Sequence, residues 1–224
     1  MKKLAAILLC LVMIIGTFCG CGKKFDVSVY DSVLTEVKKT LFLSEELMAP
    51  EGMDGIRELG AIYKEEALEM LGYRYQDLNG DNAPELVIGV SWENGGYLRN
   101  QIYLVYSVIN ETPEQILFST ARSSYSMLTD GTFAYFGSAG AIYSICGEFT
   151  LTQENVLDCT EYYFTHEIDN DFENIGVYHN STGNFDVVSS NLTDMTLDDF
   201  NDISEELTLR TLPLEEMTPF SQLP

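Results

Sequence analysis

The stretch that decides the fold runs from Tyr73 to Val90 and reads YRYQDLNGDNAPELVIGV. Before it, apolar residues recur at helical spacing, and after it short β-type runs alternate with turn residues. Residues 73–77 and 85–91 predict two strands, and the polar segment between them predicts a tight turn. The run ELVIGV is apolar enough to be a buried strand. We therefore expect a strand–loop–strand unit at the start of a sheet.

Further strands are expected C-terminal to this unit. The pair Asp130-Gly131, between runs 123–129 and 132–136, is typical of a type I′ hairpin turn. The remaining expected strands are 101–108, 114–120, 141–151, 156–165, 174–179 and 184–190. Short connections without intervening helices favour an antiparallel meander.

Helices are expected at the two ends of the chain. Apolar residues at helical spacing predict one helix over 28–43 and a second from Ile56 to Met70. Thr196 and Asp199 have the spacing of a capping box at the start of a last helix. We therefore expect an α+β fold, with two N-terminal helices packed on an antiparallel meander sheet or sandwich and a short C-terminal helix. No composition break divides 28–224, which predicts a single domain.

The loop between the first two strands carries oxygen-bearing side chains at alternating positions. Asp77, Asn79, Asp81 and Glu85 occupy relative positions 1, 3, 5 and 9, and the Ala83 carbonyl is available at position 7. Calcium binds six to eight oxygen ligands, and alternate residues of a tight loop converge on one point. The pattern predicts a structural Ca²⁺ site. The alternative is a metal-free turn rich in Asp, Asn and Gly.

An EF-hand does not fit this loop, because Ile88 stands where a bidentate Glu is required and a strand follows instead of a helix. The loop instead resembles the calcium-binding hairpin loops of FG-GAP repeats, which are found in integrin-type propellers. That resemblance implies calcium ligands at Asp77, Asn79, Asp81 and Glu85. Two positions depart from the family pattern, since Asn82 replaces a Gly and Glu85 replaces an Asp.

The N-terminus has the pattern of an export signal. Lys2 and Lys3 precede an apolar run that ends in Phe18-Cys19-Gly20-Cys21, so residues 1–20 are expected to be a signal peptide. The end of this run resembles the lipobox of bacterial lipoproteins, which implies cleavage before Cys21 and acylation (palmitate) of that cysteine. Residues 21–27 would then be a lipidated tether, and 28–224 would lie at the extracytoplasmic face of the bacterial cell membrane. The alternative is an ordinary secretory signal.

The composition excludes several classes of function. Twelve Lys and Arg residues stand against 35 Asp and Glu residues, for a formal net charge of −23, so nucleic acid is not expected as a partner. The two histidines, His166 and His179, show no metal-ligand spacing.

In a hairpin that pairs Leu151 with Val156, Cys146 would face Glu161 and lie diagonally from Cys159. Two free thiols are therefore expected in place of a disulfide.

The whole chain resembles a group of Gram-positive bacterial lipoproteins of unknown function, on the basis of Cys21, the helical segment and the loop from Asp77 to Leu86. That resemblance implies a location and an architecture but no activity. Trp92 and three nearby aromatic residues, Tyr97, Tyr103 and Tyr106, are candidates for ligand contacts. We therefore expect a non-catalytic module that binds an unknown protein, peptide or polysaccharide. The alternatives are a surface hydrolase with unidentified carboxylate catalysts and an accessory subunit of a surface complex.

Overall fold

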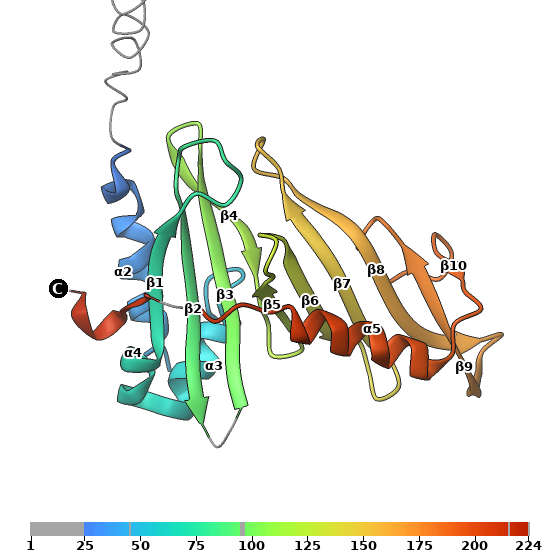
Figure 1. The fold of residues 1–224 in the computed structure, drawn as a ribbon. Coiled ribbons are helices and arrows are strands. Elements are labelled where there is room, and N and C mark those ends of the chain that lie inside the picture. The colour runs from blue at the N-terminus through green and yellow to red at the C-terminus, as the bar shows by residue number, and fades with distance from the viewer. Residues whose placement is uncertain (1–24, 45, 95–96, 215, 224) are drawn as a thin grey trace, which may run out of the picture.

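The computed structural model describes residues 25–44, 46–94, 97–214 and 216–223. The side chains of 91–99 lie outside the described part. So do residues 1–24, which hold the expected signal peptide and Cys21. Figure 1 shows one long, curved antiparallel sheet with short helices at one end and a single helix across the other half.

The described strands are β1 (Leu71–Gln76), β2 (Glu85–Asn94), β3 (Tyr97–Ile109), β4 (Thr112–Phe118), β5 (Ser123–Met127), β6 (Phe133–Ser138), β7 (Ser144–Leu151), β8 (Leu157–Ile168), β9 (Asp171–Asn180), β10 (Asn191–Leu192) and β11 (Thr218–Pro219). The α-helices are α2 (Asp31–Thr40), α3 (Asp54–Tyr63), α4 (Ala67–Met70) and α5 (Leu197–Leu209). Short 3₁₀ turns are η1 (Val27–Tyr30), η2 (Lys64–Glu66) and η3 (Phe220–Gln222).

The prediction of an α+β fold with two N-terminal helices packed on a sheet is wrong, because an eleven-stranded sheet dominates the described chain. The helical segments are short: α2 and α3 have 10 residues each. The helix expected up to Met70 ends at Tyr63, where Lys64 takes a positive φ of 53°. A left-handed residue cannot continue a right-handed helix, so 64–70 form only a 3₁₀ turn and a single α-helical turn.

The sheet divides at β3. The strand order is β10-β9-β8-β7-β6-β5-β3-β2-β1-β11, and β4 pairs beside β5 on the same edge of β3. Residues 104–109 of β3 pair with β4, whereas β5 is joined to β3 by one described residue pair, Ile102 with Tyr125. The two halves of the sheet are therefore connected through few backbone hydrogen bonds.

Three apolar clusters fill the space on the two faces of the sheet. The first joins α2, α3 and α4 to one face of β1–β3, through residues such as Leu34, Ile56 and Leu104. The second contains residues of β2–β4 together with β5–β9, such as Val105, Phe149 and Phe164, so the sheet curls around it. The third packs α5 on the opposite face of β6, β7 and β9.

The C-terminal segment ties the two halves together. The capping box expected at Thr196 and Asp199 is present at the start of α5. After α5, the Leu212 N–H donates to the Met127 carbonyl at 2.8 Å. The chain then crosses β3 and β2 to reach β1, where Thr218–Pro219 pairs as β11 (Figure 1).

The expected separation of the two cysteines is confirmed, and both thiols are free. The register differs from the expected one: Leu151 pairs with Leu157 and not with Val156, and a bulge follows between Glu148 and Phe149. As a result Cys146 lies opposite Tyr163 and belongs to the cluster under α5, whereas Cys159 packs against the second cluster. A change of register by one residue moves side chains to the other face of a strand.

No helix within the described ranges has both the length and the apolar character needed to cross a membrane.

The close contact between α2 and α3 gives a stability prediction. A Cβ on Gly60 of α3 would overlap the backbone carbonyl of Leu41 at the end of α2. In an open helix Gly→Ala gains about 1 kcal/mol, but here overpacking should lower the free energy of unfolding of Gly60→Ala by about 1–3 kcal/mol. Denaturant unfolding of the full chain in detergent measures the change.

The exposed neighbour Ala61→Gly is the control, because it should lose only the ordinary helix propensity of about 1 kcal/mol. A Gly60→Ala chain as stable as the wild type would contradict the packing of α2 against α3.

Candidate functional site

The loop between β1 and β2 folds on its own side chains. Gly80 and Asn82 take the left-handed backbone expected of them, with φ of 77° and 68°. Asp77 accepts the N–H groups of Gly80 at 2.7 Å and Asn82 at 3.0 Å. Asn79 Oδ1 accepts the Asp81 N–H at 3.0 Å, and Asp81 Oδ1 accepts the Ala83 N–H at 2.7 Å. Each predicted side-chain ligand from 77 to 81 therefore stabilises a turn of the loop.

Glu85, the last predicted ligand, is fully buried at the start of β2. Its Oε2 accepts the Leu78 N–H at 2.8 Å, and its Oε1 lies 3.1 Å from Ser107 Oγ on β3. Ser107 Oγ also lies 2.8 Å from Asn155 Oδ1, which accepts from Asn79 Nδ2 at 2.9 Å. This network, defined as Asn79, Glu85, Ser107 and Asn155, connects the loop to β3 and to the turn between β7 and β8.

Burial and the hydrogen bonds of this network act in opposite directions on the pKa of Glu85. Burial raises the pKa of its carboxyl above the ordinary value, and the charge of Asp81 adds to the effect, while hydrogen bonds from Leu78 and Ser107 oppose it. Ser107 has one hydroxyl proton but two acceptor neighbours, Glu85 Oε1 and Asn155 Oδ1. Its single proton can therefore be donated to only one of these two oxygens at a time.

The structure brings the predicted calcium ligands together but does not show them arranged as a metal site. The loop brings Asp77, Asn79, Asp81 and Glu85 into one region, yet the described residues contain no group of three His, Cys, Asp or Glu side chains arranged to hold a metal ion. Carboxylate oxygens that accept one N–H keep a second lone-pair site. Calcium at Asp77, Asn79, Asp81, Glu85 and the Ala83 carbonyl therefore stays a prediction.

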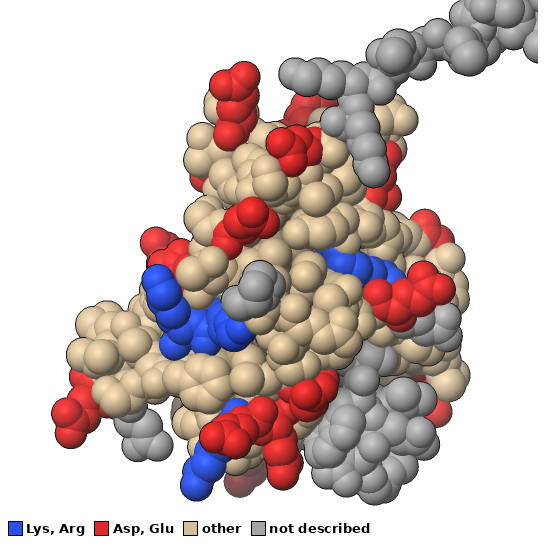
Figure 2. Space-filling model, turned by 90° about the vertical axis from the view of Figure 1, so that its left-hand side faces the viewer, with Lys and Arg blue, Asp and Glu red and all other residues tan. Residues whose placement is uncertain are grey.

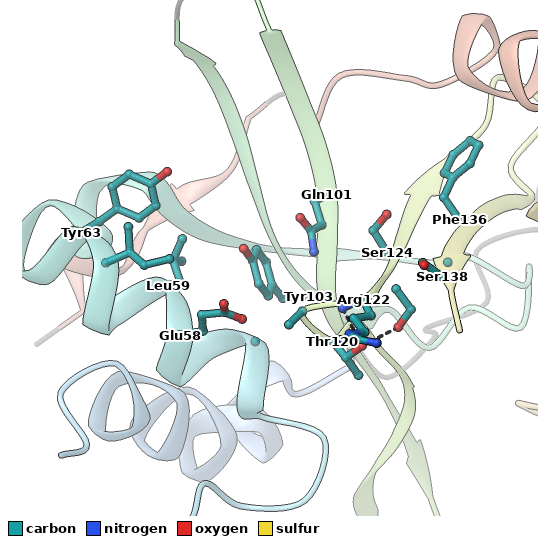
Figure 3. A pocket seen from close by; sticks show the side chains of 15 residues that line it. Glu58, Leu59, Tyr63, Gln101, Tyr103, Thr120, Arg122, Ser124, Phe136 and Ser138 are labelled. Carbon is teal, nitrogen blue, oxygen red and sulfur yellow. Dashed lines mark hydrogen bonds between the residues drawn. The ribbon is translucent and has the colours of Figure 1, made fainter. Parts of the chain in front are cut away.

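Of the predicted ligand-binding aromatics, Trp92 and Tyr97 lie on β2 and β3, but their side chains are outside the described part. Of the other two aromatic candidates, Tyr106 is buried in the first apolar cluster and is not available to a ligand. Tyr103 lines a groove of about 530 Å³ between α3 and the strands. Figure 3 shows this groove with α3 as one wall and β3, the β4–β5 turn and β6 as the other.

Two backbone features shape the groove. Ile88 pairs with Leu104 and Gly89 with Ile102, so Tyr103 is the extra residue of a β-bulge. A bulge redirects side chains, and here the adjacent residues Tyr103 and Leu104 both lie on the side of the first apolar cluster, while Ile102 belongs to the second cluster. At the N-terminal turn of α3, a Cβ on Gly55 would lie 3.0 Å from the Ser119 carbonyl and 3.2 Å from the Tyr103 ring. Gly55 therefore lets α3 sit directly against β3.

Arg122 stands at the tip of the tight turn from β4 to β5. The Thr120 N–H donates to the Ser123 carbonyl at 2.9 Å, and the Arg122 N–H donates to Thr120 Oγ1 at 3.2 Å. The Arg122 carbonyl accepts the Ser138 N–H of β6 at 2.9 Å. The backbone of Arg122 is thus fixed, whereas its exposed guanidinium forms no ion pair with any described residue.

Glu58 faces the groove from α3, and it too forms no ion pair with the described residues. The groove therefore presents one carboxylate and one guanidinium from different elements (Figure 3). Between and around them lie the Tyr63 and Tyr103 rings, the Gln101 amide and the Ser124 hydroxyl. These groups are suited to binding through hydrogen bonds, ring contacts and charge.

Sequence reasoning missed most of this groove. It singled out Tyr103, but not Glu58, Gln101 or Arg122. One signal was present: strands expected at 114–120 and 123–129 leave Ala121-Arg122 as a two-residue turn, which presents a cation at its tip.

Comparison of the chain with protein-family models, with curated proteins and with solved structures finds no match. The function is therefore argued from the site alone.

The buried carboxyl of Glu85 gives a pH prediction. Because its pKa is raised in the folded chain, the stability associated with the neutral form is complete at acid pH and is lost as pH rises through the raised pKa. Gln at this position keeps an acceptor for Leu78 and supplies a donor for Ser107 without titrating. With calcium chelated, Glu85→Gln should gain stability relative to the wild type as pH rises from 4 to 8, measured by thermal unfolding of the full chain.

Glu111→Gln, in the exposed β3–β4 turn, is the control and should show no such pH-dependent difference. Equal pH profiles for Glu85→Gln and the wild type would contradict a raised pKa at Glu85.

Proposed function

We propose that this chain is a lipid-anchored extracytoplasmic binding domain, without catalytic activity, whose ligand occupies the groove between α3 and β3. The observation that carries the proposal is the pair of opposite charges at Glu58 and Arg122 in an open groove with aromatic and amide walls, where neither charge has an ion-pair partner among the described residues. Polar groups that converge on a concave site and have no protein partner are available to a ligand.

The composition of the groove supports binding over hydrolysis. Its described lining has one carboxylate, Glu58, whereas glycoside hydrolysis uses a pair of carboxyl groups at a defined separation. The serine hydroxyls of the lining lie beside no histidine, since His166 contacts Tyr143 and Glu167 and His179 contacts Glu161. A nucleophilic serine needs a neighbouring base.

The proposed domain also has a lipid anchor and a structural calcium site. Acylation of Cys21 would hold the domain at the membrane, as a diacylglyceryl group supplies at least two chains. Calcium in the 77–85 loop would be structural, because it would fix the loop that contacts Ser107 and Asn155. The burial of Glu85 supports this role, since buried carboxylates are stabilised by protonation or by a cation.

Filling the groove tests the binding function. Ser124→Trp places a large side chain between Gln101 and the β4–β5 turn, so it should abolish binding of any groove ligand. The measurement is saturation-transfer NMR on the full chain in detergent, with a pool of amino acids, short peptides and oligosaccharides. Ser138→Trp, at the exposed end of the groove, is a second blocking variant that leaves the sheet interior unchanged.

Ser32→Trp, on the exposed surface of α2, is the control and should bind as the wild type does. If no pool member binds, or if binding persists in both blocking variants, the groove is not the ligand site.

Calcium binding is tested by thermal unfolding with calcium and with chelator. At calcium about ten times above its dissociation constant, stabilisation should be about 1.4 kcal/mol, which corresponds to a rise of roughly 3–6 °C for a domain of this size. Asp81→Asn keeps an acceptor for the Ala83 N–H but removes the charge, so it should lose most of this rise.

Asp186→Asn is the matched control, because Asp186 makes the same kind of turn contact, with the Val188 N–H at 3.0 Å, outside the loop. A calcium response that survives in Asp81→Asn would exclude the 77–85 loop as its origin.

A further inference from the structure

We propose that the groove takes a short peptide with free ends, whose ammonium group faces Glu58 and whose carboxylate faces Arg122. This assignment rests on the proposed binding function and adds the chemical class of the ligand. The two walls carry one charge of each sign, and a free peptide carries the complementary pair at its two ends.

Arg122 differs from two other arginines of the described chain, which are paired with carboxylates. Acidic residues outnumber basic ones by 35 to 12, so carboxylates are plentiful around any cation on this protein. Arg57 is paired with Asp54, and Arg210 is paired with Asp130 and Glu148. Arg122 lacks such a partner among the described residues even though its backbone is fixed on both sides. A guanidinium without a carboxylate partner is suited to bidentate recognition of a ligand carboxylate.

Glu58, on the opposite wall of the groove, disfavours ligands that carry only one kind of charge. A purely anionic ligand would be repelled by Glu58 and would leave that carboxylate unmatched. A purely cationic ligand would leave Arg122 unmatched. A zwitterion has no net charge and satisfies both groups. A ligand with a single charge is attracted by one of the two groups and repelled by the other.

The remaining lining suits a peptide between the two charges. Gln101 offers an amide donor and acceptor to the peptide backbone, and Ser124 offers a hydroxyl. Tyr63, Tyr103 and the exposed Ile62 provide ring and aliphatic surface for a side chain. The groove volume of about 530 Å³ is in the range of small-molecule sites and excludes a folded partner from its interior.

The experiment uses four versions of one peptide pool, Ala-Xaa-Ala with each amino acid in the middle: free at both ends, N-acetylated, C-amidated, and blocked at both ends. Binding to the full chain in detergent is measured by saturation-transfer NMR and titration. The free pool should contain binders whose affinity falls about two- to fivefold with either single block, as expected for one partly exposed ion pair.

Charge variants assign each end of the peptide. Glu58→Gln should weaken the free pool and become insensitive to N-acetylation, while it stays sensitive to C-amidation. Arg122→Gln should show the reverse pattern. Glu65→Gln, on an exposed residue beyond the end of α3, and Lys39→Gln, on α2, are the matched controls and should behave as the wild type.

Three outcomes overturn the assignment of ligand class. They are equal binding of free and doubly blocked peptides, the same sensitivity to both blocks in Glu58→Gln as in the wild type, and absence of any peptide binder. If oligosaccharides bind and Ser124→Trp abolishes that binding, the groove remains a binding site and only the peptide assignment fails. If nothing binds in the groove, the proposed function itself fails.

Discussion

The burial of the Glu85 carboxyl is the constraint on which the arrangement of the sheet depends. The two halves of the sheet meet at β3 and β5, where one described residue pair, Ile102 with Tyr125, is in β-sheet register. One such pair provides few backbone hydrogen bonds. On one side of that joint, the network of Asn79, Glu85, Ser107 and Asn155 links β2–β3 to the β7–β8 turn. Because buried polar groups must keep their hydrogen bonds, this network connects the two halves at a second place. The space left open beside β3 on the helical face is the groove.

Local chemistry was predictable from the sequence wherever a few adjacent residues decide the conformation. The capping box of Thr196 and Asp199 is present. A turn is present at Asp130-Gly131, but it is not the expected type I′, because Gly131 has a positive φ and Asp130 does not. Gly80 and Asn82 take the left-handed conformation that the loop requires. In these cases the side chain bonds to a backbone group within three residues, or glycine removes a steric penalty, so distant parts of the chain have no influence.

Long-range features were not predictable for physical reasons. The balance between helix and sheet was judged wrongly because amphipathic spacing does not show where a helix stops, and the change at Lys64 is a single backbone angle. The register of β7 and β8 depends on where the turn closes and on one bulge, and together these shift Cys146 from Glu161 to Tyr163. The groove requires α3, the Tyr103 bulge and the Arg122 turn to meet, and no local pattern encodes that meeting.

The strongly acidic character of the chain and the mixed charge of the groove act over different distances. Figure 2 shows acidic side chains spread in separate small groups over one face. At physiological ionic strength a surface charge is screened beyond about 8 Å, so a ligand inside the groove responds mainly to Glu58 and Arg122. The summed charge of −23 acts instead on large anionic surfaces, because a bilayer meets many groups at once. A domain tethered through Cys21 would then be held near the membrane by its lipid and kept off it by its charge.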